Sequence, residues 1–200
     1  NSGIDNTDGG YPPFSFKAVM QRIHAVIAAI EPHDSVERYT GLGVEVLQGY
    51  AKLINPWTVE ISLNADQGQP QVVRLTTRSI VIAAGARPFV PPLPGLDAVD
   101  YVTSDTLWER FAQLDEIPKR LVVLGGGPIG CELAQSFARL GSAVTQVEMA
   151  PRIMAREDED VSALVTASLR ADGVQVLTGH KALRCEGPTP ANGNTKVLVV

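Results

Sequence analysis

The chain has 200 residues, enough for one large domain or two small ones, and 44% of them are hydrophobic, so a sizeable core can be buried. Its 17 basic and 22 acidic residues give a net charge of −5, which argues against nucleic acid as a main partner because a phosphate-binding surface needs clustered Lys and Arg. No apolar run reaches the roughly eighteen residues of a membrane span.

The two cysteines, Cys131 and Cys185, lie far apart and form neither a metal-ligand spacing nor a disulfide framework. We expect both to be small, buried, apolar residues. Sparse cysteine use favours a reducing compartment, so we expect a cytoplasmic location. The three histidines have no metal-site spacing, and no metal site is predicted.

Residues 14–76 predict helices followed by antiparallel strands. Apolar residues recur every three or four positions and mark one face of a helix that ends before Pro32: Phe16, Val19, Met20, Ile23, Ile27 and Ile30. A second short helix is expected over residues 35–39. The segment TVEISL alternates apolar and polar residues, and together with YAKLI and residues 72–76 it predicts an antiparallel sheet with a turn in NADQGQP.

Residues 80–84, IVIAA, are apolar without alternation, which predicts a strand covered on both faces. A proline-rich stretch follows and imposes a stiff, extended connector between domains, in which Pro94 and Gly95 suit a type II turn. The segment TSDTLWERF then predicts a short helix capped by Ser104 or Asp105.

Residues 119–200 alternate between strand and helix, which predicts a parallel sheet with right-handed crossovers. The strands are LVVL, AVTQV and VQVL. The apolar faces of the two helices are assigned to Ile129, Leu133, Phe137 and Leu140, and to Val161, Leu164, Val165 and Leu169. The chain ends in the strand-like segment VLVV, so we expect the domain to continue beyond Val200.

The stretch LVVLGGGPIGCELA carries the glycines of a dinucleotide-binding motif between a strand and a helix. Gly125 permits the tight turn, Gly127 lets a pyrophosphate approach the backbone, and Gly130 lets the helix pack closely on the sheet. Free amides and the helix dipole then face the phosphates. The sequence therefore predicts a Rossmann-like, doubly wound NAD(P)-binding domain, with nucleotide contacts from Gly125, Gly127, Pro128, Ile129 and Gly130.

Glu148 ends the second strand, eighteen residues after Gly130. A carboxylate at this point can accept both hydroxyls of an adenosine ribose and repels a 2′-phosphate, which favours NAD. Arg152, four residues further on, could instead reach a 2′-phosphate, so NADP stays open.

The segments VIAAGARPFVPPLPG and VVLGGGPIGCELA together resemble the FAD-dependent pyridine nucleotide-disulfide oxidoreductase family. Within it, ELAQSFARLGSAVT is most similar to the mercuric reductase branch, near dihydrolipoamide dehydrogenase. The likeness covers nearly the whole chain and implies FAD and NAD(P) as cofactors. It implies an α/β fold in which residues 1–118 form part of an FAD-type domain with antiparallel strands and residues 119–200 form a truncated NAD(P)-binding domain.

The resemblance also implies roles for individual residues. Ala84 and Gly85 fall in the second FAD-contacting motif, and Ala51 would approach the FAD adenine through its backbone. Glu132 matches the family glutamate that pairs with a lysine near the flavin ring and is the candidate catalytic residue, although the helix dipole alone accounts for an acid there. Pro128 stands where relatives often place a gating tyrosine, which implies a different gate or none.

The chain lacks an N-terminal GxGxxG for FAD, a Cys-x4-Cys pair and a C-terminal dimerisation domain. We therefore expect an internal segment, inactive alone, of a homodimeric oxidoreductase that passes hydride from NAD(P)H to FAD and on to a disulfide or similar acceptor. Two alternatives stay open. One is a flavin-dependent NAD(P)H dehydrogenase or oxidase without a cysteine pair, and the other is a non-catalytic NAD(H)-binding module.

Overall fold

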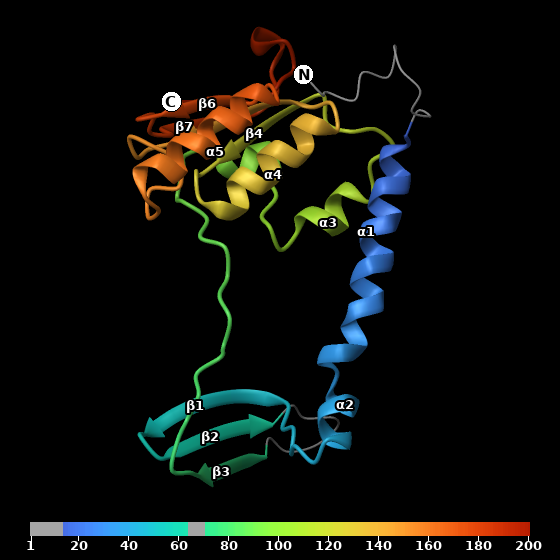
Figure 1. Cartoon of the computed structure of the whole chain (residues 1–200), viewed down its shortest axis with the longest axis vertical. Coiled ribbons are helices and arrows are strands. Elements are labelled where there is room, and N and C mark those ends of the chain that lie inside the picture. Colours follow the sequence, from blue (N-terminus) through green and yellow to red (C-terminus); the bar gives the residue numbers. More distant parts are fainter. Residues whose placement is uncertain (1–13, 64–70) are drawn as a thin grey trace. The chain divides into compact units, whose positions relative to one another are not determined.

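The computed structural model describes residues 14–63 and 71–200. These residues fold into two compact units, one formed by residues 24–87 and the other by the described residues up to Ile23 together with residues 88–200 (Figure 1). The turn expected in residues 64–70 lies outside the described residues. The domain boundary expected between residues 118 and 119 remains a prediction.

The unit of residues 24–87 begins with helical turns. Helix α1 (Phe16–Ile30) ends where the 3-10 turn η1 (Glu31–Asp34) begins, because a residue that precedes proline avoids α-helical geometry. The Ser35 side chain accepts a hydrogen bond from the Arg38 amide at 3.2 Å and caps α2 (Val36–Gly41). Both helices predicted in this part of the chain are confirmed.

A three-stranded antiparallel sheet completes this unit, and it confirms the predicted strands: β1 (Gly49–Asn55), β2 (Thr58–Leu63) and β3 (Val72–Thr76). Val59 of β2 lies opposite Leu53 of β1 and Leu75 of β3, so alternation gathers apolar residues on one face. Ile61 lies on the same face and is buried. On the other face, Glu60 forms an ion pair with Arg74 at 2.7 Å.

Residues 80–84 form no strand, so the prediction of a buried strand there is wrong. Val81 and Ile82 are 87% and 73% exposed. A strand that is covered on both faces needs strand neighbours and covering elements, and no segment within residues 14–63 and 71–200 pairs with this one. The apolar composition of residues 80–84 therefore predicted a buried strand, but it contains no information on which segments would pair with or cover that strand.

The second unit holds a parallel sheet in the order β4-β5-β6 and a short antiparallel hairpin of β7 and β8. The alternation of strand and helix confirms the predicted parallel sheet. In chain order its elements are η2 (Leu96–Val99), α3 (Leu107–Phe111), β4 (Arg120–Leu124), α4 (Pro128–Arg139), β5 (Ala143–Glu148), α5 (Glu159–Ala171), β6 (Gln175–Thr178), β7 (Arg184–Glu186), η3 (Pro190–Asn192) and β8 (Val197–Val199).

The proline-rich connector docks on this hairpin. The predicted type II turn is confirmed, because Gly95 has φ 77° and ψ 5° and the Leu96 amide donates to the Leu93 carbonyl at 3.2 Å. The Cys185 amide in β7 donates to the Pro94 carbonyl at 2.8 Å. A methyl group on Gly95 would lie 2.1 Å from the Cys185 carbonyl oxygen, so this contact requires glycine.

Helix α3 begins at Leu107, so neither Ser104 nor Asp105 caps it as predicted. The preceding turn explains the later start. The Thr106 Oγ1 accepts a hydrogen bond from the Thr103 amide at 3.0 Å, and the Thr106 amide donates to the Thr103 carbonyl at 3.2 Å. Thr106 is therefore the last residue of a turn and precedes the first helical residue.

The hydrophobic core of the second unit combines side chains from the sheet and four helices. Phe111 of α3 packs edge-to-face on Phe137 of α4, with ring centroids 5.4 Å apart, and Phe16 of α1 contacts both rings at 6.4 Å. The other core residues are Met20, Leu107, Cys131, Ala134, Val144, Ile153, Leu169, Val174 and Val176. The first turns of α1 thus belong to this unit.

The apolar face predicted for α4 is confirmed at Phe137, which is buried, and at Leu133, which packs against the core, but it is wrong at Ile129. Ile129 is 60% exposed, whereas Cys131 and Ala134 are buried beside Phe137. The close approach of the helix at Gly130 explains the difference, because only small side chains fit between its first turns and the sheet.

Candidate functional site

The glycine loop, residues 125–127, joins β4 to α4 at the carboxyl end of the parallel strands, where open α/β sheets bind ligands. Gly125 has φ +115°, a conformation that favours glycine, and its amide donates to the Val147 carbonyl of β5 at 2.8 Å. Gly127 precedes the first residue of α4, and a methyl group there would meet nothing within 4 Å. The space beside the helix N-terminus is therefore open to a phosphate group.

Gly130 occupies the closest crossing between α4 and the loop. A methyl group at Gly130 would lie 2.5 Å from the Gly125 carbonyl oxygen and 3.4 Å from the Gln146 Nε2. The structure thus brings the three motif glycines together, each with the local geometry that the motif requires.

Glu148 holds the middle of the glycine loop. Its Oε2 accepts a hydrogen bond from the Gly126 amide at 2.6 Å, and its Oε1 accepts one from the Ala150 amide at 2.7 Å. A methyl group on Gly126 would lie 3.0 Å from Oε2 and 2.8 Å from the Ile153 Cγ2, so a larger residue there would require the neighbouring side chains to shift. The carboxylate is half-buried beside the loop and keeps further lone pairs for a ligand.

The segment of residues 149–158, between β5 and α5, packs against the glycine loop. The Met154 amide donates to the Gly126 carbonyl at 2.6 Å, and Ile153 is fully buried. Arg152 directs its guanidinium at this segment, because its Nη1 donates to the Glu157 carbonyl at 2.7 Å and to the Met154 carbonyl at 3.3 Å. The amide and the carbonyl of Gly126 are therefore both hydrogen-bonded. Arg152 stabilises the segment whose Met154 amide bonds the Gly126 carbonyl.

Gln146 and Cys131 are buried polar residues that contact the carbonyls of the glycine loop. Gln146 is fully buried in β5, and its Nε2 donates to the Gly125 carbonyl at 3.0 Å and to the Cys131 Sγ at 3.5 Å. The Cys131 thiol donates to the Gly126 carbonyl at 3.6 Å. Burial raises the pKa of this thiol, which keeps it protonated as a donor.

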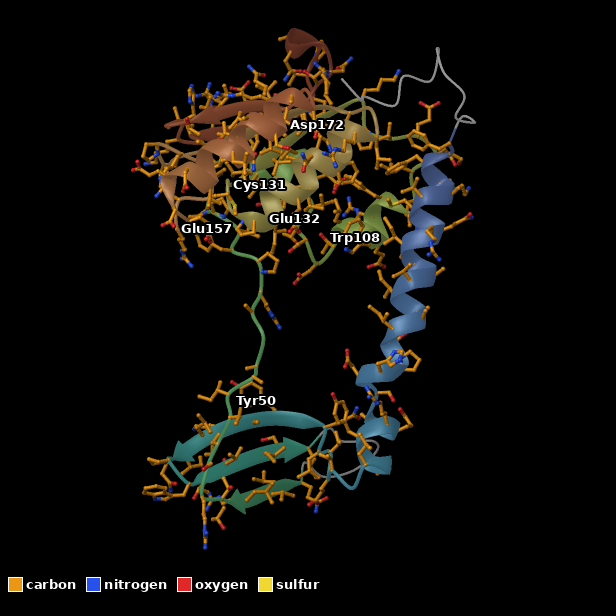
Figure 2. All side chains as sticks on the ribbon, viewed as in Figure 1. Tyr50, Trp108, Cys131, Glu132, Glu157 and Asp172 are labelled. Atoms are coloured by element: carbon orange, nitrogen blue, oxygen red, sulfur yellow. The ribbon has the colours of Figure 1, made fainter. Side chains whose placement is uncertain are left out.

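The remaining predicted residues of α4 lie near its N-terminal end, and Figure 2 labels Glu132 there. Pro128 is the first helical residue, where its missing amide leaves no bond unmade, and Ile129 is exposed. Glu132 lines a cavity of about 240 Å³ between α4 and α5, together with Gln135 and Ser168. Within the two described ranges Glu132 makes no salt bridge.

The family model of the pyridine nucleotide-disulphide oxidoreductases matches residues 9–198 of this chain. The chain belongs to this family. The α/β architecture agrees, with a parallel sheet in one unit and an antiparallel sheet in the other. The resemblance stated from the two sequence segments is confirmed.

Three relatives illustrate the similarity within this family. Mercuric reductase from Bacillus cereus is 37% identical over 75% of this chain, and dihydrolipoyl dehydrogenase from Thermus scotoductus is 37% identical over 73%. The HOCl-induced flavoprotein disulfide reductase RclA from Escherichia coli is 29% identical and matches 86% of the chain with a TM-score of 0.63. The chain spans 22%, 29% and 37% of these three proteins, respectively.

The residues that the family resemblance assigns to FAD lie in the unit of residues 24–87. Ala51 pairs with Ile61 in the antiparallel sheet, and Ala84 and Gly85 follow β3 in the irregular segment. All three residues are exposed. Their roles in cofactor binding remain predictions.

Sequence reasoning missed two residues that shape the loop, Gly126 and Gln146. Gly126 gave no signal, since the motif leaves its position variable. Gln146 did give one, because a parallel strand covered on both faces is normally apolar throughout, and a glutamine in AVTQVE breaks that pattern.

Three further observations concern the described residues. No three His, Cys, Asp or Glu side chains within residues 14–63 and 71–200 gather in a way that could hold a metal ion. No helix in the same ranges combines the length and apolar character needed to cross a bilayer. Cys131 and Cys185 are both buried, as expected.

Proposed function

We propose that this chain provides the pyridine nucleotide-binding part of a flavoprotein oxidoreductase in which hydride passes from NAD(P)H to FAD and on to a disulfide or similar acceptor. Family membership supports the class of reaction. The observation that carries the proposal is the open space beside Gly127 at a helix N-terminus, with the Glu148 carboxylate beside the same loop. The nicotinamide and the flavin supply the redox chemistry when bound.

In this proposal the residues of this chain bind the pyridine nucleotide and orient it. First-turn amides of α4 have no intrahelical acceptor and would face the pyrophosphate with the positive end of the helix dipole. The free lone pairs of Glu148 would accept the ribose hydroxyls. Pro128 and Ile129 shape the surface beside the loop, and Glu132, further along the same helix, is the proposed group near the flavin.

NADH is the preferred nucleotide in this proposal. Glu148 places a negative charge beside the ribose position, where a 2′-phosphate would be repelled. Arg152, the residue that could favour NADPH, already donates to two carbonyls of its own segment. We also propose that the whole protein is a homodimer and that its unpaired cysteines reflect a cytoplasmic location.

Replacing Gly127 by alanine should raise the Kd for NADH by about tenfold or more without lowering stability. The residue has φ −77° and ψ 176°, which alanine adopts freely, and its methyl would meet no protein atom within 4 Å. The methyl would instead occupy the path of the pyrophosphate and lengthen its bonds to the amides, at a cost of about 1.4 kcal/mol or more. Fluorescence titration of the full-length protein with NADH and its Tm would check both expectations. Unchanged affinity would contradict this binding position.

Replacing Glu148 by glutamine should shift the preference between NADH and NADPH by about tenfold toward NADPH. The glutamine keeps the shape and one acceptor oxygen for the loop but loses the charge that repels a 2′-phosphate, a difference of about 1.4 kcal/mol. The ratio of the two Kd values is the measurement. Glu148→Ala is the matched comparison, since it also releases the Gly126 and Ala150 amides and should weaken both nucleotides. An unchanged ratio in Glu148→Gln would rule out the assigned role.

A visible spectrum of the full-length protein tests the class of reaction. A flavin band that gives way to a long-wavelength thiolate–flavin band after one equivalent of NADH, without oxygen, supports the disulfide acceptor. Bleaching without that band would indicate a flavin dehydrogenase that lacks a cysteine pair. A protein with no flavin band would contradict the proposal and leave a nucleotide-binding module. The 200-residue chain alone is expected to be colourless.

A further inference from the structure

Gln146 is an anomaly in the core of the nucleotide-binding unit. It is fully buried, and among the buried polar side-chain atoms of the described residues its Oε1 alone has no hydrogen-bond partner. An unmet buried acceptor lowers the stability of the fold. An apolar side chain of the same size would avoid this penalty, so packing does not explain a glutamine at this position.

The other end of the amide contacts the glycine loop. The Nε2 donates to the Gly125 carbonyl at 3.0 Å, and through the Cys131 thiol it is linked to the Gly126 carbonyl by contacts of 3.5 and 3.6 Å. One buried side chain therefore holds the Gly125 carbonyl directly and supports, through Cys131, the Gly126 carbonyl, which also accepts from the Met154 amide at 2.6 Å. The orientation of the amide follows from this contact, because the Gly125 carbonyl needs a donor.

We propose that Gln146 is a positioning residue for the pyridine nucleotide, and this inference rests on the proposed function. The residue is fully buried and acts through the loop. It holds the Gly125 carbonyl directly and supports the Gly126 carbonyl through Cys131, which fixes the path of the backbone that leaves the space beside Gly127 open. A stability penalty at Oε1 is thus combined with a gain in loop geometry, as is typical of residues that serve a site.

The test compares Gln146→Met and Gln146→Leu with the unaltered full-length protein. Both variants keep an apolar volume of similar size and remove the amide. We expect the Kd for NADH to rise about tenfold, the worth of one lost hydrogen bond, while the Tm stays the same or rises because the unmet acceptor is gone. Hydrogen exchange of the loop amides without nucleotide should become faster in both variants.

Val144→Ala is the matched control. Val144 is buried two residues earlier on the same strand and the same face, and it contacts the core rather than the loop. This variant should lower the Tm and leave the Kd for NADH unchanged, which shows that affinity does not follow general stability.

The outcomes separate this inference from the proposed function. A protein that binds NADH with unchanged affinity in the Gln146 variants retains the proposed function but overturns the inference. Unfolding of both Gln146 variants would assign the residue to the core alone and would also overturn it. If the unaltered protein binds neither NADH nor NADPH, the proposed function fails, and the inference fails with it.

Discussion

Replacing Gly95 by alanine should lower the free energy of unfolding of the nucleotide-binding unit by about 2–4 kcal/mol. The φ of 77° costs a residue with a side chain about 1 kcal/mol, and forcing a methyl into a packed contact costs about 1–3 kcal/mol more. The contact cannot relax easily, because the opposing atom is the Cys185 backbone carbonyl at 2.1 Å and the Cys185 amide is bonded to Pro94.

Chemical denaturation followed by tryptophan fluorescence measures this effect. Trp108 reports on the unit that contains Gly95 and Trp57 on the other unit, so a Trp57→Phe background isolates the relevant signal. Gly179→Ala is the matched control, since Gly179 has φ +69° in the same unit but no atom within 4 Å of an added methyl. It should cost about 1 kcal/mol. Equal losses in the two variants would show that the close contact does not contribute.

Replacing Gly130 by alanine should destabilise the same unit by about 1–3 kcal/mol and also weaken NADH binding. Alanine favours a helix over glycine by about 1 kcal/mol, so helix propensity predicts the opposite sign. Packing should prevail, because the methyl would lie 2.5 Å from the Gly125 carbonyl oxygen. That carbonyl is held by Gln146, and the Gly125 amide is bonded to Val147.

The same denaturation and titration experiments check this variant. Gly127→Ala provides the contrast, since it is expected to reduce affinity without a loss of stability. A Gly130→Ala protein that is more stable than the unaltered chain would show that the helix can move away from the loop.

The βαβ unit could be predicted because several local signals agree on it. The glycine spacing, the helix period and the position of Glu148 all depend on residues close in sequence, and the structure places them at one loop. The type II turn at Gly95 was predictable for the same reason. Both belong to short segments whose geometry is set by glycine and proline.

Features that depend on distant neighbours could not be predicted. Residues 80–84 have the composition of a buried strand, but burial requires partners, and composition says nothing of where these are. The buried face of α4 was assigned to large residues such as Ile129, yet close packing at Gly130 selects Cys131 and Ala134. The role inferred for Gln146 depends on a contact with the loop, which the strand pattern alone does not contain.

The bonds on both sides of Gly126 bear on the entropy of ligand binding. Its amide is bonded to Glu148 at 2.6 Å and its carbonyl to Met154 at 2.6 Å, so both partners belong to the chain itself. Fixing the backbone of one residue costs about 1–2 kcal/mol of conformational entropy. Here that loss accompanies folding of the chain, so it does not subtract from the affinity for a ligand that arrives later. The glycine loop is flexible in composition but preorganised in the folded protein.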